Sequence, residues 1–237
     1  MEDRVDEQAP SSTPRLSRDL VITTALEQID SDGLNGLSMR NLAKSLHVEA
    51  MSLYRYVNGR EDLLEGIVDL LMTDLTAALE RARAEQWQRF LQVTAHEVRR
   101  IAIEHPRAFP LVATRHPAAP WLRPPLRSVE VVEIFLSALL DYGFSDGQAV
   151  DAYRAFSSFL LGQLLLESAV RGADTSPAEE PLDEGGADIP QDDGSRSLAD
   201  LTQVERLRPL LSEDHAEEEF EVSLESLLDR LDRQLSQ

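Results

Sequence analysis

The side chains best suited to recognition chemistry lie between positions 50 and 56, with an arginine on either side. If this stretch is helical, Leu53 and Val57 face a core and the six residues around them face outward. Arginine can donate two hydrogen bonds to guanine, hydroxyl groups can reach phosphates or base edges, and small apolar side chains can touch thymine methyl groups. The pattern therefore predicts a surface that reads double-stranded DNA. The predicted DNA-binding residues are Arg40, Ala50, Met51, Ser52, Tyr54, Arg55, Tyr56 and Arg60.

The alternative interpretation of these residues is a small helical subdomain whose polar face is merely solvated. Two tyrosines and an arginine on one short helix are poor choices for such a face, because aromatic rings that bear a polar group are typical of recognition surfaces. We therefore favour DNA binding over a solvated face.

Two short helices and a tight turn are predicted to hold this surface. Ser38 can cap the first helix, and Ala43 is small enough to let the second pack closely against it. His47 occupies the turn position that requires left-handed backbone, which histidine tolerates better than most residues. The second helix is expected from Ala50 to Val57, where Asn58-Gly59 ends it. These features predict a helix-turn-helix.

The surrounding periodicity predicts an all-α protein. A preceding helix is capped by Ser17 and ended by Gly33, and a long amphipathic helix begins at Glu61. Nothing in the second half alternates as a strand does. Further helices are expected at 87–104, 126–142, 145–170 and 216–235, with an irregular, proline-rich connection at 107–125.

The net charge of −20 argues against nucleic acid until its distribution is considered. Between residues 15 and 60 six basic side chains outnumber five acidic ones, whereas nineteen acids face five arginines from Gly172 onward. A DNA-binding face must therefore lie in the first quarter of the chain. The absence of cysteine excludes disulfides, thiol catalysis and cysteine-bound zinc. With no apolar leader and no membrane-spanning run, we expect a soluble, cytoplasmic protein that does not bind a membrane.

Two other classes of function compete with a DNA-binding regulator. An enzyme is disfavoured because the sequence has no glycine-rich phosphate loop and no Gly-x-Ser-x-Gly motif. A helical interaction module that has lost DNA binding is the other possibility. The histidines lack metal-ligand spacing and the acidic stretch at 183–194 does not fit a calcium loop, so we predict no metal and no cofactor.

Three motifs resemble the DNA-binding domain of the TetR (tetracycline repressor) family: Leu37–Ala43, Val48–Val57 and Arg60–Leu64. The segments Trp87–His105 and Gly143–Gly162 resemble the ligand-binding domain of its tetracycline-repressor branch. The resemblance implies a regulator that binds operator DNA through the eight residues above. It is most simply a repressor released by a small molecule, with an activator of the same fold as the alternative.

The resemblance also implies a domain organisation. We expect a disordered arm at 1–14, a helix-turn-helix domain at 15–62 and a ligand-binding and dimerisation domain at 63–237, in which 172–197 forms a mobile acidic loop. The helix from Arg60 to about Ala77 is expected to relay ligand binding to the DNA-binding heads.

Position matching to the tetracycline repressors predicts a largely apolar pocket. Thr76 and Leu111-Val112 replace the histidines that hold tetracycline and its metal there, so a more apolar effector than magnesium-bound tetracycline is favoured. The predicted ligand-binding residues are Thr76, Thr94, Val98, Arg115, Val132, Phe135, Tyr153 and Ser157.

The last predicted helix carries an apolar stripe that must be buried. Its positions are Phe220, Leu224, Leu227, Leu228, Leu231 and Leu235. The stripe can belong to the core of one chain. The resemblance favours the alternative, a four-helix bundle in which 145–170 and 216–235 of two subunits form a homodimer.

Overall fold

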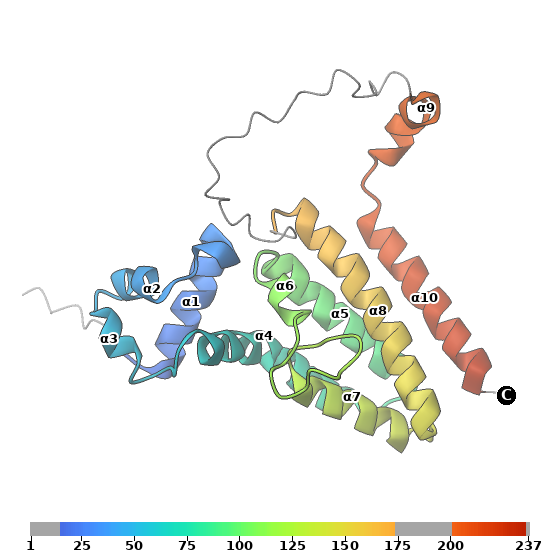
Figure 1. The fold of residues 1–237 in the computed structure, drawn as a ribbon. Helices are drawn as coiled ribbons and strands as arrows, with labels where there is room; N and C mark the ends of the chain where they lie inside the picture. Colours follow the sequence, from blue (N-terminus) through green and yellow to red (C-terminus); the bar gives the residue numbers. More distant parts are fainter. Residues whose placement is uncertain (1–14, 174–200, 236–237) are drawn as a thin grey trace, which may run out of the picture. The chain divides into compact units, whose positions relative to one another are not determined.

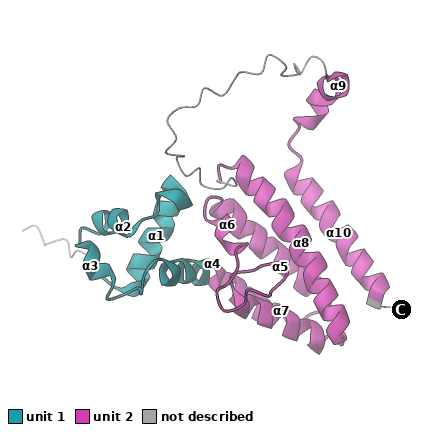
Figure 2. Cartoon of the chain, in the orientation of Figure 1, with its two compact units in different colours: residues 1–70 teal, residues 71–237 magenta. Residues whose placement is uncertain are grey.

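A computed structural model describes residues 15–173 and 201–235 (Figure 1). The predicted arm and most of the predicted acidic loop lie outside these residues. The chain divides into two compact units at Leu70/Leu71, which is later than the boundary after Asp62 that we expected (Figure 2). The boundary is later because the helix that begins at Arg60 buries its first apolar residues in the first unit. These residues are Leu63, Leu64 and Ile67.

The first unit is built from short helices whose ends follow the predicted caps. It contains α1 (Arg18–Asp32), a 3₁₀ turn (Leu34–Gly36), α2 (Met39–Ser45), α3 (Ala50–Leu53) and the first part of α4 (Arg60–Ala82). Ser17 Oγ accepts a hydrogen bond from Leu20 N, and Gly33 ends α1 at a φ of 77°. Ser38 Oγ likewise accepts from Asn41 N at the start of α2.

Helix α4 approaches α1 so closely that only glycine fits at the contact. A Cβ on Gly66 would lie 2.5 Å from Ile22 Cδ1. Ile22 is itself buried, as are Val21 and Ile29 of the same helix. The two helices therefore form the base on which α2 and α3 are held.

The second unit is an all-helical assembly around α8 (Asp146–Val170). Helices α5 (Trp87–Glu104), α6 (Phe109–Val112), α7 (Val129–Asp141) and α10 (Ala216–Leu235) each contact α8. Figure 1 shows α10 running alongside α8. The start of α8 carries a full capping box, in which Ser145 and Gln148 satisfy each other's backbone N–H groups.

The structure changes three predicted elements of this unit. The predicted helix at 126–142 begins only at Val129, because Ser128 caps it by accepting from Val131 N. The proline-rich connection contains a helical turn, α6, with a proline in its first turn. A further helix, α9 (Thr202–Leu211), was not predicted and has no buried residue.

The stripe on α10 is buried within the single chain. Phe220 is fully buried and Leu224 is 1% exposed, and α10 contacts α5 and α8 of its own unit. Among the described stripe residues, those from Phe220 to Leu231 therefore belong to the intramolecular core, not to a face that only a second subunit could cover. No helix in the described residues is long and apolar enough to cross a membrane.

Candidate nucleic-acid interface and effector cavity

The turn between α2 and α3 has the backbone that the sequence predicts. His47 has a φ of 54°, the one positive value found at a non-glycine residue among the described positions. Val48 N donates to Ala43 O across the turn, which brings α3 against the small side chain of Ala43, itself 3% exposed. The helix-turn-helix is thus closed by one strained residue and one small residue.

The predicted recognition helix, residues 50–57, is less regular than expected, and we call it the recognition segment. The α-helix ends at Leu53 instead of Val57, and the chain continues as a tighter turn in which Tyr56 N donates to Leu53 O at 2.9 Å. The predicted inward residues are correct, since Leu53 is fully buried and Val57 is 1% exposed. The turn therefore keeps the same side chains buried and the same side chains facing outward as a continuous helix would.

The predicted DNA-binding residues differ in how far they reach into solvent. Met51 is 76% and Tyr54 is 48% exposed, and Arg40 and Arg55 are exposed as well. Ala50, Ser52 and Tyr56 are half-buried. Arg60 is exposed, yet its Nη1 donates to Leu37 O at 2.7 Å, so one of its hydrogen-bond donors holds the loop before α2.

A polar clamp that the sequence did not reveal fixes the end of the recognition segment. Arg18 donates to Asp62 Oδ1 at 2.7 Å and to Tyr56 O at 3.0 Å, while Asn58 N donates to Asp62 Oδ2 at 2.7 Å. The hydrogen bond from Arg18, followed by that from Asn58, lowers the pKa of Asp62. The carboxylate is therefore kept charged, and it joins α1, the recognition segment and the start of α4.

The second unit encloses an apolar cavity of about 40 Å³. Phe135 lines it, and the centre of its ring lies 5.4 Å from that of Phe156 and 6.0 Å from those of Phe90 and Tyr153. Helix α4 contributes Met72 and Leu75 to the wall. The remaining lining residues are Thr94, Val98, Val112, Leu126, Val131, Val132, Tyr153, Phe156, Ser157, Leu160 and Leu161.

Six of the eight predicted ligand-binding residues line this cavity: Thr94, Val98, Val132, Phe135, Tyr153 and Ser157. Thr76 and Arg115 do not. Thr76 is half-buried and donates to Thr73 O at 2.9 Å, and Arg115 is exposed in the connection between α6 and α7. Several of the lining residues that the sequence did not single out are leucines and valines, which carry no signal that separates a cavity wall from an ordinary core.

The few polar groups of the cavity wall already have partners. Thr94 Oγ1 donates to Phe90 O at 2.8 Å, and Tyr153 Oη donates to Pro124 O at 3.0 Å. Burial raises the pKa of Tyr153, and its hydrogen bond with Ser157 offsets part of that rise. The phenol therefore stays neutral and acts as a donor.

The outer side of α8 and α10 forms a second hollow, of about 530 Å³. It is lined by Ala155, Ser158, Phe159, Val222, Ser223, Ser226, Leu227 and Arg230. Small and apolar side chains dominate it, and Val222 is 57% exposed.

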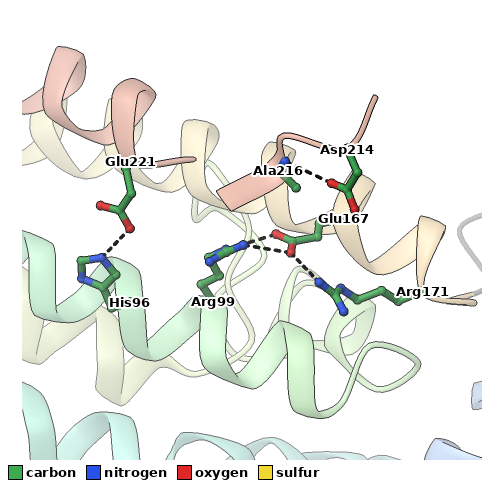
Figure 3. Close-up of polar contacts among 7 residues, drawn as sticks. All are labelled: His96, Arg99, Glu167, Arg171, Asp214, Ala216 and Glu221. Carbon is green, nitrogen blue, oxygen red and sulfur yellow. Dashed lines mark hydrogen bonds and ion pairs between the residues drawn. The ribbon is translucent and has the colours of Figure 1, made fainter. Parts of the chain in front are cut away.

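Side-chain contacts join α5 to both α8 and α10. Arg99 donates two hydrogen bonds to Glu167, at 3.2 and 3.3 Å (Figure 3). Its guanidinium lies 5.0 Å from the centre of the Phe220 ring. His96 Nε2 lies 2.9 Å from Glu221 Oε1 of α10 (Figure 3). The described residues hold no group of three His, Asp or Glu side chains that could bind a metal.

Two family models match the chain. Residues 21–67 match the model of bacterial regulatory proteins of the tetR family, and residues 81–235 match the tetracyclin repressor-like C-terminal domain. Together the two models cover the helix-turn-helix and the cavity-bearing unit.

Individual relatives and solved structures agree with these matches. The tetracycline repressor protein class E of Escherichia coli is 34% identical over 155 residues, which make up 65% of this chain and 70% of that protein. An HTH-type transcriptional regulator of Saccharopolyspora erythraea is 29% identical over 178 residues, 75% of this chain and 72% of that protein. A possible TetR family transcriptional regulator from Streptomyces coelicolor has a TM-score of 0.69 and 24% identity, covering 92% of this chain and 99% of its own. ActR from the same organism, in complex with actinorhodin, has a TM-score of 0.65 and 22% identity, covering 94% and 100%.

Proposed function

Because the chain belongs to the TetR family, it is a DNA-binding, ligand-responsive transcriptional regulator and not an enzyme, and we propose that it is a homodimeric repressor released from its operator by an apolar small molecule. The observation that carries the proposal is the pairing of an exposed recognition segment in one unit with an apolar cavity in the other. Binding to operator DNA assigns its action to the cytoplasm.

The recognition segment reads the operator through side chains that no part of the described chain neutralises. Arg40 and Arg55 are exposed and pair with no acidic side chain among the described residues. Arg55 is suited to a guanine edge, and Met51 and Tyr54 extend furthest into solvent. Arg60, held by Leu37 O, contributes through its position beside the phosphates.

Dimerisation through α8 and α10 supplies the second head that an operator with two half-sites requires. Because the stripe on α10 is buried inside the chain, the bundle forms through the adjoining face, at the hollow around Phe159 and Val222. Small residues such as Ala155 and Ser158 in that hollow permit helices to approach closely. Leu166 and Val170, at 73% and 89% exposure, extend the apolar face along α8.

The effector binds in the cavity around Phe135. Its wall is apolar, and ActR, a protein of similar fold, forms a complex with actinorhodin. A drug-sized molecule needs a pocket of roughly 300–1,000 Å³, so an effector must displace side chains to enter. Met72 and Leu75 are displaced with them, and both lie on α4, the helix that continues into the first unit. Ligand binding is in this way relayed to the DNA-binding heads.

Fluorescence anisotropy with the DNA upstream of the protein's own gene tests the proposal. Arg55→Ala and Tyr56→Ala should each weaken binding by about 1–3 kcal/mol, roughly 5- to 150-fold. Arg89→Ala, which removes an exposed arginine on α5, is the matched control and should bind as the wild type does. Unchanged binding in both recognition variants would remove this segment as the reader.

A cavity-filling variant tests the ligand response separately from DNA binding. Ser157→Phe adds a ring inside the cavity and should abolish release of the operator by effectors while leaving the affinity for DNA unchanged. A variant that still responds normally would mean that the effector binds elsewhere.

A further inference from the structure

The longest stretch of the chain without any acidic residue lies next to the cavity. Between Glu104 and Glu130 the sequence has four arginines, at 107, 115, 123 and 127, and no aspartate or glutamate. In a protein of net charge −20 such a stretch is a local reversal of sign. It begins directly after α5 and contains α6 and the connection between α6 and α7 (Figure 1).

This basic segment forms part of the cavity wall. Val112 and Leu126, which both belong to it, line the cavity. Arg127 N donates to Val112 O at 3.0 Å, which closes the segment into a loop, and Tyr153 Oη holds Pro124 O from inside the cavity. Residues 112–127 thus form a loop beside the cavity, which we call the cover. Val112 and Leu126 at its base line the cavity, and arginines lie along it.

Arg127 is the arginine of this segment that lies next to lining residues in the sequence. It follows the lining residue Leu126 and precedes α7, whose Val131 and Val132 also line the cavity. Its side chain is 6% exposed, and its Nη1 lies 3.4 Å from Thr114 Oγ1. A guanidinium held in apolar surroundings is a strong site for a carboxylate, a phenolate or a sulfonate, because its hydrogen bonds to such groups are charge-assisted.

The uncharged polar groups of the cavity offer little to a ligand in comparison. Thr94 Oγ1 and Tyr153 Oη already donate to backbone carbonyls of this chain. An incoming polar group would have to break one of these bonds, with no net gain. An arginine of the cover offers an anionic group charge-assisted hydrogen bonds, which these uncharged groups cannot match.

We propose that the effector is an organic anion, with an apolar body in the cavity and one acidic group bound by Arg127 and assisted by Arg123 of the cover. This inference rests on the proposed effector cavity and specifies the chemical class that it takes. Arg123 is exposed and its Nη1 donates to Pro120 O and Leu122 O, so it orders the loop and lies at its solvent side. The arginines also raise the local concentration of anions around the cover.

Two fluorescent dyes that differ in one charged group test this directly. The probes are 8-anilinonaphthalene-1-sulfonate and its uncharged parent, N-phenyl-1-naphthylamine, titrated into the purified full-length protein. Arg127→Gln and Arg123→Gln should weaken the sulfonate dye by about tenfold and about threefold and leave the uncharged dye within twofold. Arg89→Gln, which removes the same charge from α5, is the control and should change neither.

Ser157→Phe separates failure of this inference from failure of the cavity itself. If it blocks both dyes while the arginine variants weaken both equally or neither, the cavity stands and the anionic class is wrong. If Ser157→Phe leaves both dyes bound, the proposed effector cavity is wrong and this inference falls with it. Because Arg127 is buried, its loss can unfold the cover, so the affinity of Arg123→Gln for the sulfonate dye is the second measurement. If this variant is folded and its affinity for the sulfonate dye is unchanged, the proposed role of the cover is wrong.

Discussion

Gly66 gives the sharpest test of how the first unit is packed. Glycine in a helix interior costs about 1 kcal/mol relative to alanine, so the usual expectation is that Gly66→Ala stabilises α4. Here the added Cβ would lie 2.5 Å from Ile22 Cδ1 and 3.0 Å from Ile22 Cγ1. Ile22 is 8% exposed and can move only by displacing its own neighbours. We predict that the substitution destabilises the first unit instead.

The magnitude follows from two opposing effects. Helix propensity favours the variant by about 1 kcal/mol, and overpacking a filled contact costs about 1–3 kcal/mol, so the expected net loss is about 1 kcal/mol. Ile22→Val removes the Cδ1 atom and costs about 1 kcal/mol by itself. In the double variant the clash is largely relieved, so the two changes should couple favourably by about 1–2 kcal/mol.

Urea unfolding of the full chain measures these differences. Trp87 and Trp121 both lie in the second unit, so tryptophan emission reports on that unit while circular dichroism at 222 nm reports on both. The loss should appear in circular dichroism and not in tryptophan emission. Gly147→Ala is the control, because a Cβ there meets nothing within 4 Å, and it should be neutral or stabilising by about 0.5 kcal/mol. A Gly66→Ala variant as stable as the control, or an additive double variant, would refute the close-packing argument.

Three further substitutions probe the polar contacts. Asp62→Asn should lower the free energy of unfolding by about 1–2 kcal/mol near neutral pH. Because folding lowers the pKa of Asp62 below 3.8, this loss is full well above pH 3.8 and shrinks as the pH falls through the pKa of the folded protein. Urea unfolding of both proteins at pH 7 and pH 3 measures the difference. Glu167→Gln should destabilise the second unit by about 3 kcal/mol, because it leaves Arg99, whose side chain is 13% exposed, without its bidentate carboxylate; a loss below about 1 kcal/mol in tryptophan-monitored unfolding would contradict this. Ser145→Ala removes the capping box of α8 and should cost about 1 kcal/mol. The control is Arg154→Ala, at an exposed position within the same helix, which should cost less than half of that.

The first unit could be predicted closely because its signals are local. A serine before an apolar run caps a helix through its own neighbours, and Ser17 and Ser38 both do so. His47 was predictable for the same reason, since the requirement for positive φ acts on a single residue. The end of α3 was wrong by one turn, because the tighter bonds after Leu53 keep the same residues inward and leave no trace in the periodicity.

The second unit was less predictable where the cause lies far away in sequence. The α10 stripe signals burial, but not whether its own chain or a second copy covers it, and the structure assigns its described part to α5 and α8. The cavity wall could be predicted in part from the resemblance, yet an apolar residue beside a cavity has the same type as one in a filled core. Helix α6 carried a usable signal in Pro110, which is favoured in the first turn of a helix, whereas Pro209 inside α9 is a residue that normally ends one.

The clamp around Asp62 limits how a ligand can control DNA binding. Tyr56 O and Asn58 N, at the end of the recognition segment, are tied through Arg18 and Asp62 to the start of α4. Gly66 presses the next turn of α4 against α1. The recognition segment, α1 and the start of α4 are therefore fixed to one another by charge-assisted hydrogen bonds and close packing. Under the proposed function, a ligand that shifts Met72 and Leu75 at the cavity changes operator affinity by moving this assembly as a rigid body, without loosening the proposed DNA-reading residues within it.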